Sequence, residues 1–94
     1  VQTGGPDDRH AWGLFTIMVD NRDAVMARLK DQGIPSAVYY AKPLHQHKAF
    51  AAHAPAEPLV NCEWLADHAL SLPFHPYLTD EQIDRVSSAL LDAL

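Results

Sequence analysis

Residues 11–19, Ala-Trp-Gly-Leu-Phe-Thr-Ile-Met-Val, are rich in aromatic and β-branched side chains and are followed by Asp20-Asn21. This composition predicts a β-strand of about eight residues. Alternation along a strand gives two sets of side chains, one on each face: Leu14, Thr16 and Met18, and Phe15, Ile17 and Val19. Because both sets are largely apolar, we predict that both faces are covered and that this strand is the central one.

A helix is predicted directly after this strand. Asp20 or Asn21 can accept hydrogen bonds from the free amides of a first helical turn. Gly33 marks the expected end, because glycine readily adopts the left-handed conformation that follows a helix. Between these limits three apolar side chains recur at helical spacing: Val25, Met26 and Leu29. The expected helix is about eleven residues long.

A second strand is predicted over Ser36–Tyr40, since Pro35 biases Ile34 away from the helical region and restarts an extended chain. A strand, a helix and a strand with short connections most simply form a βαβ unit. A longer excursion of the chain would leave the two strands antiparallel.

The second half of the chain predicts two helices and a brief strand. Residues 59–69 have helical periodicity that buries one stripe of residues: Cys62, Leu65, Ala66 and Ala69. The same helix keeps Glu63, Asp67 and His68 near water. Residues 70–74 suit an edge strand, because the missing amide of Pro73 does no harm at a sheet edge.

The final helix has the clearest start signal of the chain. Thr79-Asp80-Glu81-Gln82 matches a capping box, in which the Thr79 hydroxyl and the Gln82 side chain each pair with a backbone amide of the other residue. Four apolar residues then lie on one face down to the C-terminus: Ile83, Val86, Leu90 and Leu94.

These elements predict an α/β fold of two layers, with a sheet of about three strands and helices mainly on one face. Residues 1–10 hold two glycines, a proline and two adjacent aspartates with little to bury, which favours a linker or frayed terminus. We therefore expect one domain over residues 11–94. The start, without a methionine or an apolar leader, resembles the middle of a longer chain.

Composition restricts the partners. Seven Lys and Arg against twelve Asp and Glu give a net charge of −5, which argues against nucleic acid or an anionic membrane surface. No apolar stretch approaches the roughly 18 residues of a membrane span. The single Cys62 cannot form an internal disulfide and is compatible with a reducing cytoplasm. We expect its thiol to be a small buried hydrophobic group.

The loop after Val38 is the candidate site. Six side chains with polar tips lie at predicted strand ends: Tyr39, Tyr40, Lys42, His45, His75 and Tyr77. Such groups suit recognition of a hydroxyl-rich or phosphate-bearing ligand by hydrogen bonds and stacking. The alternative is that each tyrosine only packs with its hydroxyl at the surface.

Other chemistries have little support. His45-Gln46-His47 is the one close histidine pair, and a metal site would need a third ligand such as His53, His75 or Cys62. Solvated or hydrogen-bonded histidines are the simpler interpretation, so no metal is expected. The sequence has neither a Gly-x-Ser-x-Gly nucleophile motif nor a glycine-rich phosphate loop.

Three segments together resemble the C-terminal end of the DegT/DnrJ/EryC1/StrS aminotransferases: residues 33–40, the Pro43-Leu44-His45 loop, and residues 70–79 with Gln82-Ile83. Those enzymes use pyridoxal phosphate, have the aspartate aminotransferase fold (fold type I) and aminate keto sugars that are mostly nucleotide-linked. The resemblance covers about residues 12–94. It implies that this chain is the C-terminal small domain of such an enzyme.

The resemblance also implies roles. Tyr40 matches a family residue that contacts the nucleotide sugar or the cofactor-bound substrate, whereas Tyr39 stands where the family usually has histidine. Tyr39, Tyr40 and His45 are therefore the expected substrate-facing residues, and Lys42 has no family role. None of them is expected to be catalytic or to bind the cofactor.

The family's cofactor lysine, the acid that pairs with the pyridine ring and the phosphate-binding residues belong to a large domain outside these 94 residues. The resemblance thus implies a large pyridoxal-phosphate domain as partner, a homodimeric parent enzyme, and no cofactor binding or transamination by this chain alone. The alternative is a free-standing binding or interaction module derived from the same fold.

Overall fold

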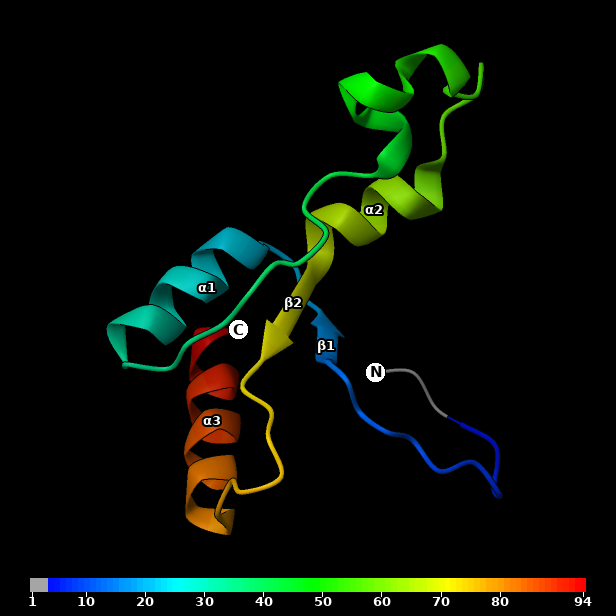
Figure 1. The fold of residues 1–94 in the computed structure, drawn as a ribbon. Coiled ribbons are helices and arrows are strands. Elements are labelled where there is room, and N and C mark those ends of the chain that lie inside the picture. Colours follow the sequence, from blue (N-terminus) through cyan, green and yellow to red (C-terminus); the bar gives the residue numbers. More distant parts are fainter. Residues whose placement is uncertain (1–3) are drawn as a thin grey trace.

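The computed structural model describes residues 4–94 and contains a small sheet with three α-helices (Figure 1). The elements in chain order are β1 (Phe15–Met18), α1 (Arg22–Asp31), α2 (Val60–His68), β2 (Ala69–Leu72) and α3 (Asp80–Ala93). Two 3-10 helices, Leu44–Gln46 and Lys48–His53, lie between α1 and α2. No helix within residues 4–94 has the length and apolar character needed to cross a membrane.

The sheet has β2 in its middle. β1 pairs with β2 in antiparallel register, with Phe15 opposite Leu72. On the other side of β2, the backbones of Ala37 and Ser71 exchange hydrogen bonds of 3.0 and 2.8 Å in an antiparallel bridge. The predicted central position of residues 11–19 and edge position of residues 70–74 are therefore wrong. β1 and the chain at Ala37 run parallel, as in the predicted βαβ unit, with β2 inserted between them.

The predicted strand over residues 36–40 is reduced to this single bridge, so the three-stranded detail is not confirmed. In the register of Ala37 with Ser71, the next hydrogen-bonded pair would be Pro35 with Pro73. Neither proline has an amide hydrogen to donate, so the ladder cannot continue in that direction. In the other direction the next such pair would be Tyr39 with Ala69, and the described residues form no backbone hydrogen bond there.

The hydrophobic core lies on one face of the sheet, against α1 and α3 (Figure 1). Its buried members are Val19, Val25, Leu29, Ile34, Leu70, Ala89 and Ala93. The opposite face is open: Leu14 and Met18 of the β1 segment are 41% and 40% exposed. The prediction that both faces of this strand are covered is wrong for the described chain.

The two ends of α1 differ in how well the sequence predicts them. Gly33 has φ +73°, its amide bonds to Lys30 O at 2.9 Å, and the Ile34 amide bonds to Leu29 O at 2.9 Å. This is a Schellman ending, and it confirms the predicted stop. At the start, Asn21 is itself left-handed (φ 50°) and makes no side-chain cap bond, so the predicted cap is wrong. The Asn21 carbonyl instead accepts from the next turn of the helix.

The capping box of α3 is confirmed. Thr79 Oγ1 accepts from the Gln82 amide at 3.2 Å, and Gln82 Oε1 accepts from the Thr79 amide at 3.0 Å. The buried face agrees with the prediction in part: Val86 and Leu90 are partly buried against the core, whereas Ile83 and Leu94 are exposed. The buried residues of α3 are Ala89 and Ala93.

Residues 4–10 belong to no helix or strand and are exposed, while residues 1–3 of the predicted linker lie outside the described residues. The division into a linker and a domain over residues 11–94 stays a prediction.

We predict that Leu70→Ala lowers the free energy of unfolding by about 2–5 kcal/mol, the range for deleting a fully buried leucine side chain. Leu70 is 0% exposed and contacts the core from the middle strand. The measurement is denaturant unfolding of both chains. Leu91→Ala is the matched control: Leu91 is largely exposed on α3, so its change should stay within about 0.5 kcal/mol. Equal losses in the two variants would contradict a one-sided core.

Candidate functional site

The uncovered face of the sheet forms the floor of a groove with a volume of about 1210 Å³. The floor is made by the sheet residues Leu14, Thr16, Met18 and Ala69, one wall by Cys62, Leu65 and Ala66 of α2, and the mouth by residues 39–44 and His47. The groove is open to solvent and mainly apolar. It carries several of the predicted site residues.

The α2 wall corrects the burial prediction for residues 59–69. Of the predicted apolar stripe, Ala66 is buried, whereas Cys62 and Leu65 are exposed to the groove. The helical periodicity identifies the correct face, since this face points at the groove. Nothing in the described chain lies over that face, so the predicted burial of the Cys62 thiol is wrong here.

A pair of hydroxyl groups lies at the floor of the groove, where Thr16 lines the groove and Ser71 does not. Thr16 Oγ1 and Ser71 Oγ are 2.8 Å apart, and Ser71 is buried. These two residues face each other across the register of β1 and β2. The bond satisfies the Ser71 hydroxyl, which would otherwise be buried without a partner.

Tyr39, Tyr40 and Lys42 come together at the mouth of the groove. Both tyrosines are exposed, and all three residues line the groove. The lining contains no carboxylate, and Lys42 is its one residue with a permanent formal charge. An apolar floor with two phenols and an ammonium at its edge suits a ligand with hydroxyl groups and negative charge.

His45 lies apart from this group. Its Nε2 is 3.0 Å from Glu63 Oε1 of α2, the two side chains are 15% and 35% exposed, and neither residue lines the groove. Sequence reasoning placed Glu63 near water and gave it no role. The signal that could have found it is its position in the first turn of the helix that follows the loop.

The other polar residues of the predicted set also lie elsewhere. His75 Nδ1 accepts from the Tyr77 amide at 3.2 Å in the loop before α3, away from the groove. His47 lines the groove mouth, where its Nε2 donates to Lys42 O at 3.2 Å. Within the described part of the chain, no three His, Cys, Asp or Glu residues are arranged to hold a metal ion.

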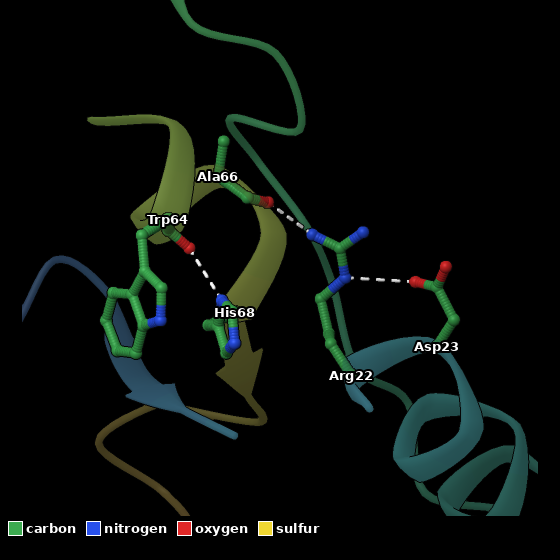
Figure 2. Close-up of polar contacts among 5 residues, drawn as sticks. All are labelled: Arg22, Asp23, Trp64, Ala66 and His68. Carbon is green, nitrogen blue, oxygen red and sulfur yellow. Dashed lines mark hydrogen bonds and ion pairs between the residues drawn. The ribbon is translucent and has the colours of Figure 1, made fainter. Parts of the chain in front are cut away.

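The junction of α2 and β2 is fixed by polar contacts from both sides (Figure 2). Arg22, at the start of α1, donates to the Ala66 carbonyl and pairs with Asp23 at 3.0 Å. On the other side, His68 Nδ1 donates to Trp64 O at 2.8 Å, and its ring stacks on the Trp64 ring at 4.3 Å between centroids. The Arg22 bond joins the end of α2 to α1, whereas the contacts between Trp64 and His68 lie within α2 and stabilise its last turn.

Comparison with solved structures defines the class of fold. The chain superposes on an aminotransferase from Brucella abortus with a TM-score of 0.85 and 38% identity, and on S. venezuelae DesV, solved with a ketimine intermediate, with a TM-score of 0.86 and 35% identity. Each superposition covers 96% of this chain and 24% of the other. The architecture is thus that of part of a fold type I aminotransferase.

The sequence identifies the family. The model of the DegT/DnrJ/EryC1/StrS aminotransferase family matches residues 1–91, and the chain belongs to this family. A curated relative, UDP-N-acetyl-3-dehydro-α-D-glucosamine 3-aminotransferase of Acidithiobacillus ferrooxidans, is 44% identical over 81 residues, which are 86% of this chain and 22% of the relative. The chain spans about a quarter of the length of the proteins it matches.

Aminotransferases of this family depend on pyridoxal phosphate. The groove does not fit this cofactor by itself, because its lining holds no carboxylate to face the pyridine nitrogen. Its one lysine, Lys42, lies on a solvent-exposed loop, which lacks the desolvated pocket that activates a lysine as a nucleophile. The groove residues can recognise and orient a ligand but supply no amino-transfer chemistry.

We predict that Thr16→Val destabilises the chain by about 1–3 kcal/mol, because it leaves the buried Ser71 hydroxyl without a partner. The double variant Thr16→Val/Ser71→Ala should recover most of this loss, since both polar groups are then removed. Denaturant unfolding of the two single variants and the double variant measures the coupling. Additive losses would show that the two hydroxyls do not interact.

Proposed function

We propose that this chain is the C-terminal small domain of a pyridoxal-phosphate-dependent aminotransferase that acts on nucleotide-linked keto sugars. The observation that carries the proposal is the match to a sugar aminotransferase, 44% identical, of which the chain spans 22%. In this proposal residues 11–94 are the domain and residues 1–10 connect it to the preceding part of the enzyme.

The uncovered face supports a role for the groove as one half of an active-site cleft. Leu14, Met18 and Leu65 expose apolar surface there that water solvates poorly. A large domain of the same polypeptide, lying over this face, would bury that surface and close the groove. That domain would bind pyridoxal phosphate through its own lysine, and two such polypeptides would form a homodimer. A cytoplasmic location is part of the same proposal.

Tyr39 and Tyr40 are the proposed substrate contacts, because both residues are exposed and line the groove. Lys42 is placed to face the negative charge of a nucleotide-linked sugar, and it does so without carboxylate competition from the lining. His45 belongs to the same substrate-facing loop and contributes through its attachment to α2.

The test is a transamination assay with an amino donor, pyridoxal phosphate and nucleotide-linked keto sugars. The 94-residue chain alone should give no amino sugar, whereas the polypeptide that carries it with the large domain should turn over. Mass spectrometry of the sugar product measures this. Turnover by the isolated chain would contradict the assignment of catalysis to the large domain. No turnover by the longer polypeptide with any keto sugar would contradict the proposed activity.

In that longer polypeptide, Tyr39→Phe and Tyr40→Phe should each raise the KM for the sugar by about two- to tenfold, the effect of losing one hydrogen bond of about 0.5–1.5 kcal/mol. Tyr77→Phe is the matched control, because Tyr77 is equally exposed but lies outside the groove. Steady-state kinetics of the three variants measure the effect. A KM that rises as much in Tyr77→Phe would rule out a specific role for the groove tyrosines.

A further inference from the structure

The segment of residues 41–54 is attached to the rest of the molecule in an unusual way. Its two 3-10 helices contain no buried residue, and they project beside the start of α2, away from α1 and α3 (Figure 1). The large apolar side chains of the segment, Leu44 and Phe50, are exposed. Pro43 is the one buried residue of the segment, so apolar packing holds its start, and contributes little to holding residues 44–54 in place.

Hydrogen bonds within residues 4–94 give the segment one external attachment. Its backbone bonds are local, as in Gln46 to Pro43 and Phe50 to His47, and the His47 ring returns to Lys42 of the same segment. The contact between His45 Nε2 and Glu63 Oε1, at 3.0 Å, joins it to another element. Both side chains are partly shielded from water, which makes a charge-assisted bond stronger than one at an open surface.

The position of this bond links it to the groove. His45 directly follows Lys42, Pro43 and Leu44, which line the groove mouth, and Glu63 directly follows Cys62, which lines the α2 wall. The bond therefore joins the mouth of the groove to its α2 wall, although neither His45 nor Glu63 lines the groove. A carboxylate on one ring nitrogen also fixes which way the imidazole faces.

We propose that Glu63 is a positioning residue that acts through His45 to hold the mouth of the groove, with Tyr40 and Lys42 on it, in its substrate-facing conformation. That the mouth faces a substrate rests on the proposed function, whereas the attachment of the mouth to α2 rests on the geometry alone. Without the Glu63 carboxylate, the loop keeps its local bonds but loses its one polar attachment to α2. The groove mouth then samples positions in which Tyr40 and Lys42 no longer face the ligand.

The first measurement is native-state hydrogen exchange, made on the polypeptide that carries this sequence as its host expresses it. Glu63→Ala should speed exchange of the amides of residues 40–50 about three- to tenfold, the size expected for losing a partly exposed charge-assisted bond. The amides of α1 and α3 should not change. Glu63→Gln should keep most of the protection, because its amide oxygen can still accept from His45 Nε2. Glu57→Ala is the control: Glu57 is an exposed acid of the neighbouring loop that makes no ion pair within the described residues.

The second measurement is steady-state kinetics of the same variants. Glu63→Ala should raise the KM for the sugar several-fold with kcat nearly unchanged, and Glu63→Gln should restore it. Unchanged exchange in residues 40–50, or faster exchange with an unchanged KM, would overturn the positioning role. A third outcome is that Glu63→Ala exchanges faster while neither the variant nor the wild type transaminates. That outcome would support the attachment and count against the proposed function.

Discussion

One-sided burial of the sheet is the constraint on which the rest of this structure depends. Leu70, on the middle strand, is fully buried against α1 and α3, and the core of the molecule gathers around it. The described residues form one such core. The other face of the sheet is open, and α2 borders that face instead of extending the core. The groove is the direct consequence of this arrangement.

Because the core is thin, the C-terminal ends of the helices lie near the surface. Arginine side chains of neighbouring helices donate hydrogen bonds to the carbonyls at these ends. Arg28 of α1 donates to Ala93 O at 2.6 Å, Arg85 of α3 donates to Gln32 O at 3.0 Å, and Arg22 donates to Ala66 O. Each acceptor lies in the last turn or at the C-cap of a helix, where carbonyls lack helical partners and the dipole favours a positive charge. Each of the three helices is thereby joined to another at its C-terminal end.

The sequence predicts well what local chemistry decides. The Gly33 stop and the Thr79 capping box are confirmed because each depends on a few adjacent residues. Strand order was predicted wrongly, since composition says which residues are extended but not which strand lies between the others. Pro35 and Pro73 cannot form a hydrogen-bonded pair of the sheet. This obstacle is visible only once Ala37 is known to pair with Ser71. The periodicity of residues 59–69 found an apolar face without revealing what covers it.

The same distinction applies to the site. Tyr39, Tyr40 and Lys42 could be found from sequence, because polar tips that follow an apolar run mark a loop at the end of a strand. Glu63 is harder to find, because its role comes from a partner 18 positions away, and its place in the first turn of α2 does not identify that partner. The interpretation of His45 changes as well. The sequence predicts that its imidazole faces the ligand, whereas in the structure its Nε2 lies against the Glu63 carboxylate of α2. In a loop whose one buried residue is Pro43, such a bond can set where the neighbouring side chains point, and the proposed recognition in this groove then depends on residues that do not line it.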